Sequence, residues 1–446
     1  MFDDIIHSLN LKVENVESIS HAFKNNTHFY FIKLVSRGIF CPNCGQYTQK
    51  VHEYKTISLN HSIFIAENAS VIYKARRYIC PHCSKTAFEH SPFKSHHPRL
   101  TLKTIQNVLL LLKDYNQTFS MVAKKTNLSV TEVMTIFDEH VQIERKKLPE
   151  AMCIDEFFFS RHAKNKYACM LINFKNGLVL DILPSRHKSD LRTYFKMISL
   201  EERMNVKYIT MDLYDNYRDI AYHWLPNAVV CADSFHVIKN INDVLNKLRI
   251  TKMHDYEDNK KSDEYYLLKH KNYLLFKDSL DISDTEYKKN RHFSMRYTDG
   301  QLLEKMLSID EQLKEGYELK ELYMIFIQQD DPDTIESFLE LIINNYKLST
   351  IVGFQKLGNT LESWKKEIIN SFIKYDKRKL SNGPIEGRNK YIHIILELAN
   401  GYSNFKRFRN RAMYILNKFE THSDRILDVY SVRGKGKERG KYNTKK

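Results

Sequence analysis

The stretch that most constrains the fold is residues 151–160, AMCIDEFFFS, an apolar and aromatic run that predicts a β-strand. Two acids, Asp155 and Glu156, lie inside it. Acids are rare within strands because a buried charge is costly unless it is paired or binds a cation. Successive strand residues point to opposite faces of a sheet, so the two acids cannot share one site. The pattern predicts that one carboxylate faces a positive group, and we expect Asp155 to bind a divalent metal ion.

The segments that follow this strand predict an α/β fold. Residues 166–174 and 178–183 are strand-like runs on either side of Asn176-Gly177, which is the strongest short signal for a hairpin. Strand and helix patterns then alternate: strands over 206–211 and 228–232, which end at Asp212 and Asp233, and helices over 185–198, 214–224 and 235–248. Three antiparallel strands followed by this alternation predict a ribonuclease-H-like core.

Length, charge and hydropathy limit the number of domains, the type of binding partner and the location that we expect for this protein. A length of 446 residues predicts about three domains. The formal net charge of +15, from 69 basic and 54 acidic side chains, favours a polyanionic partner, although a solvated basic surface would give the same balance. No apolar run approaches the ~18 residues that cross a bilayer, and the N-terminus lacks a secretory signal. We therefore expect a cytoplasmic protein with no membrane partner.

Four cysteines form two C-P-x-C pairs, Cys41 with Cys44 and Cys80 with Cys83. Each pair aims two thiolates at one point, and two pairs supply the four ligands of a closed tetrahedral zinc site. Two disulfides are the alternative, which is disfavoured in a chain without a secretion signal because cytosolic thiols stay reduced. The other cysteines lie in apolar runs and are predicted to be core residues: Cys153, Cys169 and Cys231.

Two further patterns before residue 149 are typical of DNA-binding proteins. The run 74–78 combines Lys74, Arg76 and Arg77 with a tyrosine, which fits an edge that contacts phosphates, although a solvated face would look the same. Residues 118–125 and 130–140 have the spacing of a helix-turn-helix, and Ser129 with Glu132 predicts a capping box. The second of these helices is not basic, and any short helical hairpin would match the spacing.

Several stretches, in order along residues 40–415, together resemble one family. They are CPNCG, RRYICPHC, IDEF with KYACMLINFKNGLVLDILPSR, MDLYDNYRDIA, PNAVVCADSFHVIKN, and SNGPIEGRNK with NGYSNFKRFRNR. The chain resembles the ISL3 family of bacterial insertion-sequence transposases, which have an acidic active site of the DDE type. Each stretch is weak by itself, whereas the ordered set is specific. The sequence departs from the family where His393, Glu397 and Ser234 stand in place of basic residues.

The resemblance implies that Asp155, Asp212 and Glu386 are catalytic metal ligands. Without it, Asp212 would be interpreted as a helix cap and Glu386 as an acid favoured at a helix N-terminus. The resemblance also places Asp233 and His236 beside the active site, as an auxiliary ligand or an orienting group; the alternative is an N-cap with a helical histidine.

The family resemblance further implies a chemistry and a partner. Three carboxylates hold two Mg²⁺ or Mn²⁺ ions, which suit hard oxygen ligands. Water and then a freed 3′-hydroxyl attack phosphodiesters, so no covalent protein–DNA intermediate is required. The partners are double-stranded DNA, as element ends and as target, and a second copy of the chain on DNA. The location is the cytoplasm, in association with the nucleoid.

The C-terminal half of the sequence contains two more features. Residues 250–375 show helical patterns only, over 265–275, 299–315, 319–329 and 333–346, and resemble the insertion that separates the second aspartate from the glutamate in such enzymes. Residues 404–411 interleave aromatic residues with basic ones, which suits a surface that follows a nucleic-acid strand. The basic residues of this run are Lys406, Arg407, Arg409 and Arg411.

The sequence thus predicts a multidomain α/β protein with a ribonuclease-H-like core interrupted by an all-α insertion and preceded by zinc-binding and helix-turn-helix domains. The predicted segments are a lead-in (1–37), the zinc-binding domain (38–95), the helix-turn-helix domain (96–148), the first part of the core (149–249), the insertion (250–375), the second part of the core (376–430) and a disordered basic tail (431–446). Two alternatives to a transposase remain: a non-catalytic DNA-binding regulator, and a structure-specific nuclease of the same fold.

Overall fold

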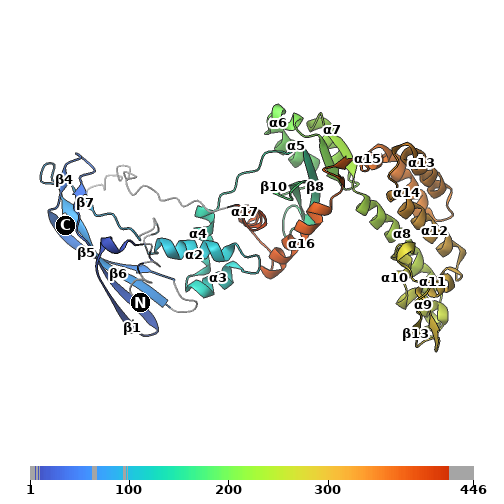
Figure 1. Ribbon diagram of the computed structural model, residues 1–446, viewed down its shortest axis with the longest axis horizontal. Coiled ribbons are helices and arrows are strands. Elements are labelled where there is room, and N and C mark those ends of the chain that lie inside the picture. The colour runs from blue at the N-terminus through green and yellow to red at the C-terminus, as the bar shows by residue number, and fades with distance from the viewer. Residues whose placement is uncertain are drawn as a thin grey trace, which may run out of the picture. The chain divides into compact units, whose positions relative to one another are not determined.

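The computed structural model describes residues 6, 9, 11–62, 68–93, 97 and 99–420 (Figure 1). The predicted tail at 431–446 falls wholly outside these residues. The chain divides into two compact units, Met1–Glu144 with Tyr391–Lys446, and Arg145–Lys390. Among the described residues, no helix has both the length and the apolar character needed to cross a membrane.

The first unit contains a twisted sheet with the strand order β1-β2-β6-β5, and β7 pairs with β6. Its strands are β1 (Val16–Lys24), β2 (Thr27–Leu34), β5 (Val51–Asn60), β6 (Asn68–Ile79) and β7 (Thr86–Phe88), with a separate short pair, β3 (Ile39–Phe40) and β4 (Tyr47–Thr48). A short 3-10 helix, Val13–Asn15, precedes β1. Strand β2 lies beside β6 in parallel, so residues before and after 38 share one sheet and one core. The predicted boundary at residue 37 therefore falls inside a single folded layer.

Four helices complete the described part of the first unit: α2 (Leu102–Leu112), α3 (Phe119–Thr126), α4 (Val130–His140) and α17 (Phe405–Leu416). The predicted capping box is confirmed, because Ser129 accepts from the backbone of Glu132 and the Glu132 side chain accepts in return. Between α3 and α4 the chain turns at Asn127, which has a left-handed conformation.

Helix α17 packs on the helices that precede β8 (Ala151–Phe158). Tyr414 meets Phe137 of α4 edge to face, and Arg407 pairs with Asp138 of the same helix. The sequence predicts that residues 376–430 form the second part of the core. The structure instead groups everything from Tyr391 with the first unit, because the apolar face of α17 is buried against α2, α3 and α4.

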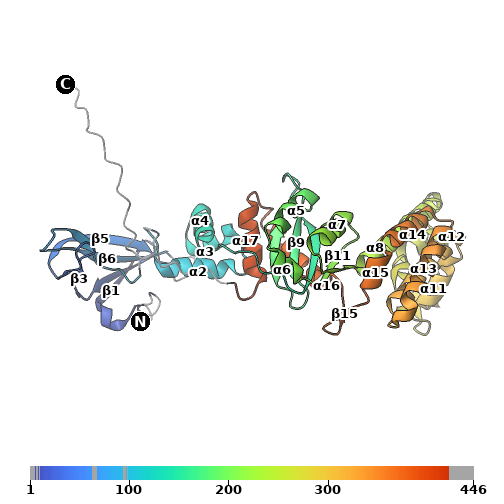
Figure 2. The same ribbon diagram turned by 90° about the horizontal axis from the view of Figure 1, so that it is seen from above.

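The second unit is built on a five-stranded sheet with the order β10-β9-β8-β11-β12. Strands β9 and β11 of this sheet are labelled in Figure 2. Its strands are β8 (Ala151–Phe158), β9 (Tyr167–Asn173), β10 (Val179–Leu183), β11 (Tyr208–Met211) and β12 (Val229–Ala232). The three predicted antiparallel strands are confirmed, and β11 and β12 continue the sheet in parallel with β8. Gly177 takes a positive φ of 66° in the predicted Asn-Gly turn. Strands β11 and β12 are buried along most of their length, as near-continuous apolar runs predict.

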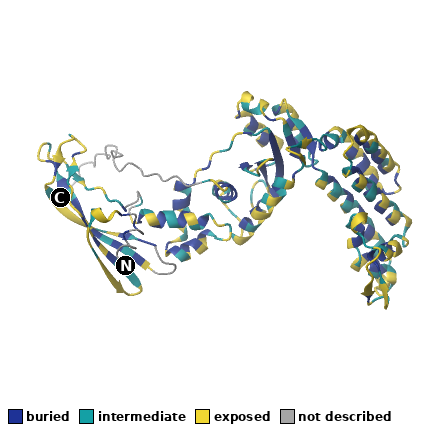
Figure 3. Ribbon diagram, viewed as in Figure 1, coloured by how far each residue is buried: buried dark blue, intermediate teal, exposed yellow. Residues whose placement is uncertain are grey.

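Helices alternate with these strands as predicted: α5 (Lys188–Lys196), α6 (Leu200–Met204), α7 (Asp215–Trp224) and α8 (Ser234–His254). Buried side chains of α5, α7 and α8 join the sheet in one apolar core, and the burial of the strands is visible in Figure 3. Because β8, β11 and β12 run in parallel, their carboxyl ends lie at one edge of the sheet, which brings Asp212 and Asp233 close to Asp155.

The segment 250–375 is mainly helical. Its elements are η2 (Glu257–Asn259), α9 (Asp263–His270), α10 (Tyr273–Phe276), η3 (Ser279–Asp281), β13 (Lys288–Asn290), β14 (Met295–Tyr297), α11 (Asp299–Leu307), α12 (Glu311–Ile327), α13 (Pro332–Leu348), α14 (Val352–Ser363), α15 (Lys365–Asn370) and β15 (Lys374–Tyr375). The prediction of helices only was wrong at the β13–β14 hairpin. The expected helix over 299–315 is two helices, because Asp310 caps α12 by accepting from Leu313.

The insertion shares its core with the sheet. Buried side chains of α12 to α15 join the same apolar cluster as β8 and β11, and α15 packs against β12. A second cluster lies at the far end, where α9, α10 and α11 pack on the beginning of α12. Trp364 is 3% exposed, as expected of a core residue.

Helix α16 (Gly383–Leu398) carries Glu386 and follows the short strand β16 (Arg378–Lys379). It begins at the predicted turn Asn382-Gly383-Pro384, where proline is tolerated in the first turn. The Arg388 side chain donates to the carbonyl oxygen of Gly177 at 3.0 Å, which fixes α16 against the β9–β10 turn.

Candidate active site and zinc site

The four C-P-x-C cysteines lie together in the first unit, and each offers a sulfur atom within 4.8 Å of the others. The Sγ atoms of Cys41 and Cys83 are 3.5 Å apart, and so are those of Cys44 and Cys80. A tetrahedral zinc ion with Zn–S bonds of about 2.3 Å would separate its sulfur ligands by about 3.8 Å. The residues present therefore fit a structural zinc ion, and none of the seven cysteines forms a disulfide.

The two cysteine pairs are held in matching turns. Gly45 donates to the carbonyl of Cys41 at 2.8 Å, and Ser84 donates to that of Cys80 at 2.9 Å. Backbone N–H groups of Asn43 and Cys44 aim at the Cys41 sulfur and lower its pKa to about 7. Backbone N–H groups also lower the pKa of Cys80. Both effects favour the thiolate form that binds metal.

A second cluster of ligand atoms lies at the carboxyl edge of the second unit's sheet. Atoms of Asp155, Asp212 and His236 all lie within 4.8 Å of one another. Asp155 is on β8, Asp212 directly follows β11, and His236 is in the first turn of α8. The fold thus brings together two of the three predicted acids and the predicted histidine.

Asp155 is 5% exposed, and both of its oxygens accept hydrogen bonds. The backbone N–H of Glu156 donates to Oδ1 at 2.7 Å, and the Asn389 amide donates to Oδ2 at 2.7 Å. Burial, together with the charge of Asp212, raises the pKa of Asp155 to about 8. An ionised carboxylate is therefore unfavourable there unless a cation is bound.

His236 bridges Asp212 and Asp233. Its Nδ1 lies 2.9 Å from Asp212 Oδ1 and 2.8 Å from Asp233 Oδ2. Burial disfavours the imidazolium, but the hydrogen bonds to the two carboxylates outweigh it and raise the pKa of His236 to about 10. Asp233 is 1% exposed and occupies the N-cap position of α8, as the helix-cap alternative predicts, but its side chain makes no cap hydrogen bond and contacts His236 and the backbone N–H of Asn382 instead.

Glu386 lies beside this cluster and is not one of its mutually close members. Its Oε1 is buried and has no hydrogen-bond partner. Burial raises the pKa of Glu386, and the charges of Asp233 and Asp212 raise it further. An orphaned carboxylate oxygen next to these two aspartates fits a site for a divalent cation, because hard oxygen donors suit Mg²⁺ and Mn²⁺.

Sequence reasoning missed two asparagines at this site. Asn382, which is fully buried, donates its backbone N–H to Asp233 Oδ1 at 2.9 Å and its amide to Asp212 Oδ1 at 3.0 Å. Its own Oδ1 accepts from Thr210 of β11 at 2.7 Å. Asn382 thereby ties the start of α16 to the ends of β11 and β12. Both asparagines lie in the run SNGPIEGRN, which is part of the stretch that carries the family resemblance.

Glu156 faces away from Asp155, as strand alternation predicts. It pairs with Arg186 and accepts from the Tyr217 hydroxyl at 2.9 Å. The Arg186 guanidinium also lies over the rings of Tyr167 and Tyr214. Of the two acids in β8, Glu156 is thus the one paired with a protein cation, and Asp155 is the one without such a pair.

The basic residues predicted to contact DNA near the zinc site differ in exposure. Lys74 is exposed, and Arg77 is half-buried in an ion pair with Glu53. Arg76 is 6% exposed, pairs with Glu89 and donates to the carbonyl of Leu34 at 2.6 Å. The guanidinium of Arg76 makes its ion pair and hydrogen bond inside the unit, so it does not form part of an exposed phosphate-contacting edge.

Three of the four basic residues predicted on α17 hold the first unit together. Arg407 pairs with Asp138, Arg409 donates to the carbonyl of Ile143 at 2.7 Å, and Arg411 is 1% exposed. Arg411 donates to carbonyls of the α2–α3 loop, and its guanidinium lies over the Phe119 ring. Lys406 is exposed. The expected basic surface is therefore largely a packing interface.

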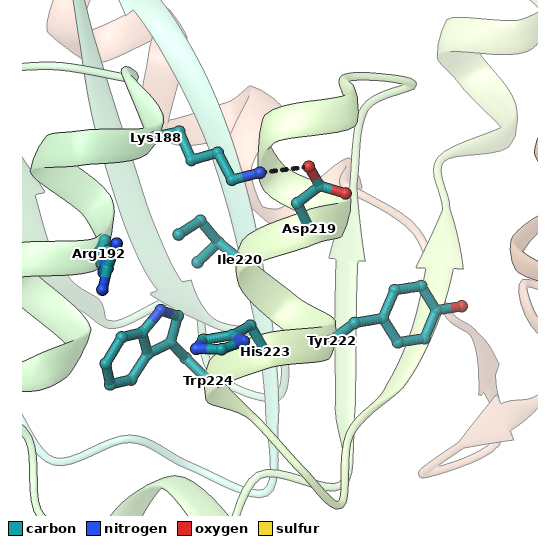
Figure 4. A pocket seen from close by; sticks show the side chains of 7 residues that line it. All are labelled: Lys188, Arg192, Asp219, Ile220, Tyr222, His223 and Trp224. Carbon is teal, nitrogen blue, oxygen red and sulfur yellow. Dashed lines mark hydrogen bonds and ion pairs between the residues drawn. The ribbon is translucent and has the colours of Figure 1, made fainter.

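A pocket of about 510 Å³ opens between α5 and α7 (Figure 4). Lys188 reaches across it to pair with Asp219 at 2.6 Å. The indole of Trp224 forms part of its wall, and Arg203 covers this ring. The charge of the pocket is partly neutralised by Asp219, and no acid of the candidate active site lines it.

Comparison with known proteins agrees with this architecture. The ISL3 family model, described as transposase, matches residues 152–412. A second model, the zinc finger of the transposases IS204, IS1001, IS1096 and IS1165, matches residues 37–83.

Curated relatives point the same way. The transposase for insertion sequence element IS1001 from Bordetella parapertussis is 22% identical over 388 residues, which cover 85% of this chain and 89% of that protein. The transposase for IS1557 from Mycobacterium tuberculosis is 26% identical over 101 residues, 23% of this chain and 22% of that protein. A protein named ATP-dependent protease from Lactococcus lactis is 28% identical over 116 residues, 26% of this chain. The family match spans more than half of the sequence and includes the candidate acids, and on this ground the chain belongs to the ISL3 family of DDE transposases.

Proposed function

We propose that this transposase cuts and joins DNA at the ends of an insertion sequence, with Asp155, Asp212 and Glu386 as ligands of divalent metal ions. The observation that carries the proposal is that the buried Asp155 on β8 and the partly buried Asp212, which follows β11, lie together, next to the orphaned Oε1 of Glu386. When bound, Mg²⁺ or Mn²⁺ would neutralise the phosphate and lower the pKa of the attacking water.

The residues around the acids orient them. Asn382 holds Asp212 by a hydrogen bond, and its backbone anchors α16 to Asp233, so Glu386 is presented from a fixed helix start. His236, bonded to Asp212 and Asp233, is an orienting group. Its positive charge offsets the two aspartates while no metal is bound. No serine or tyrosine nucleophile is part of the proposal, because water and a DNA 3′-hydroxyl are the attacking groups.

We interpret the second unit as a ribonuclease-H-like catalytic core with a helical insertion. Its strand order, three antiparallel strands followed by two parallel ones, supports this interpretation. We also propose that α3 and α4 act as a helix-turn-helix and that the first unit binds the terminal repeats. The domain scheme then changes in two places: the sheet of the zinc-binding domain begins before residue 38, and the core ends near residue 390.

The exposed residues Lys74 and Lys406, with the partly exposed Arg77, are the proposed phosphate contacts. Lys406→Ala is expected to lower the slope of log affinity against log salt by about 1, as one lost phosphate contact predicts. Arg411→Ala is expected to lower thermal stability, because it empties a buried position against Phe119. Binding titrations over a salt series and thermal melts measure the two effects. An unchanged salt slope for Lys406→Ala would remove this residue from the DNA surface.

The proposal is tested by incubating the full-length protein with a matched element end, a plasmid target and Mg²⁺. We expect products in which the element's 3′ end is joined to the target. Cut ends without joined products would indicate a structure-specific nuclease, and binding without any cut would indicate a DNA-binding regulator. On DNA we propose a dimer, since two ends are handled together, and we expect the protein to act in the cytoplasm on nucleoid DNA.

A further inference from the structure

Asn389 lies on the same face of α16 as Glu386, one turn further along the helix. Its two polar atoms have different environments. The amide nitrogen donates to Asp155 Oδ2 at 2.7 Å, while the amide oxygen is buried and has no hydrogen-bond partner. When Asp155 is ionised, the nitrogen side of the amide faces it, because only that side can donate to a carboxylate.

The buried oxygen of Asn389 needs an explanation. Leaving a buried acceptor without a partner costs about 1–3 kcal/mol. Glu386 Oε1 is orphaned in the same way and lies on the same helix face. Two unsatisfied oxygens beside buried carboxylates form a donor set for a hard cation, and amide oxygens ligate such cations as carboxylates do.

The position of Asn389 is built into the fold. The neighbouring Arg388 binds the β9–β10 turn, and Asn382 anchors the start of the helix to Asp233 and Asp212. Helix α16 is thus fixed at its first turn and again one turn later. The amide of Asn389 is presented to β8 by a rigid element, which is what precise ligand placement requires.

We propose that Asn389 is a fourth oxygen donor of the catalytic cation site, which positions Asp155 through its amide nitrogen and contacts the cation through its amide oxygen. The inference rests on the proposed function, because it concerns the same site. It extends the set of three acids to an Asp-Asp-Glu-Asn set in which the third and fourth members are spaced E-x-x-N on α16.

The test measures Mn²⁺ affinity by calorimetry on full-length, zinc-loaded protein without DNA. The heat of Mn²⁺ binding that is lost in the variant Asp155→Asn is assigned to the acidic site. Asn389→Ala is expected to weaken the Asp155-dependent Mn²⁺ binding about 10–100-fold, the range found when a partner of a metal ligand is lost. Asn345→Ala is the matched control, because Asn345 is an exposed helical asparagine of the same unit that donates to Leu341. It should bind Mn²⁺ as the wild type does.

A second variant separates ligation from support of the fold. Asn389→Asp keeps an oxygen donor and loses the N–H donor. Without metal, we expect Asn389→Asp to melt at a lower temperature than the wild type. We expect Mn²⁺ to raise the melting temperature of Asn389→Asp by at least as much as it raises that of the wild type. Wild-type affinity in Asn389→Ala would overturn the inference while leaving the proposed function intact. Loss of Mn²⁺ binding in Asn389→Asp equal to that in Asn389→Ala would overturn the oxygen-donor role. Absence of any Asp155-dependent Mn²⁺ binding in the wild type would overturn the proposed function and the inference together.

Discussion

Asp155→Asn is expected to reduce DNA cleavage and joining by at least about 1,000-fold, more than the 10–100-fold loss typical of removing only an outer partner of a metal ligand. The reason is that Asp155 is the buried carboxylate on β8 that has no protein cation paired with it. The measurement is the rate at which joined product forms from a pre-cut element end. Glu156→Gln gives the comparison on the neighbouring residue, because its carboxylate faces Arg186 and Tyr217 instead.

The same substitution should not unfold the protein, and this separates a catalytic effect from a structural one. An acid whose pKa rises on folding loses stability as the pH climbs from its ordinary pKa toward the raised value. For Asp155 this window runs from 3.8 to about 8. The neutral amide escapes the penalty, so metal-free Asp155→Asn should melt at or above the wild-type temperature at pH 8, with a smaller difference at pH 5. A variant that is inactive and also melts well below the wild type would refute the assignment of Asp155 as a ligand.

Cys80→Ser is expected to remove the bound zinc and to abolish binding to element ends. In zinc-finger peptides, zinc binding contributes an apparent free energy of about 10–16 kcal/mol to folding. This is comparable with the whole free energy of unfolding of a small domain. Here the sheet of the first unit has an apolar core separate from the cysteine turns. We therefore expect local loss of order around β3, β4 and β7, with the sheet itself retained.

Zinc content by elemental analysis, limited proteolysis and end binding measure these effects together. Cys231→Ala is the matched control, because Cys231 is a fully buried core cysteine of the second unit. Its zinc content should equal that of the wild type. Full zinc content in Cys80→Ser, or undiminished binding to element ends by a zinc-free protein, would contradict the role given to this site.

The sequence predicted most of the second unit's sheet because its signals are local. Each signal depends on only a few neighbouring residues. The signals are the alternation of apolar residues, the Asn176-Gly177 turn and the acids next to strand ends. Once β8 and β11 pair in parallel, Asp155 and Asp212 lie at the same edge of the sheet, and no other contact has to be predicted to place them there. The cysteine site was predictable for the same reason, since each C-P-x-C pair forms its own turn.

The parts that could not be predicted depend on contacts between distant segments. Arg76 and Arg411 looked like surface cations, because burial of a guanidinium depends on carbonyls and carboxylates supplied by other strands and helices. Helix α17 packs on α4 across more than half of the chain, and no local pattern in residues 405–416 indicates this. Asn389 was missed for a similar reason: its importance follows from the side chain of Asp155, which only the fold brings near.

The central claim is that the acids Asp155, Asp212 and Glu386 bind a common divalent cation at the edge of this sheet. The most direct measurement is a crystal structure of the full chain with Mn²⁺, with data collected for the anomalous signal of manganese. The account predicts an anomalous peak within ligand distance of Asp155 and Asp212, with Glu386 Oε1 turned toward the same ion. Manganese bound elsewhere, with these carboxylates still paired only to His236, Asn382 and Asn389, would contradict it.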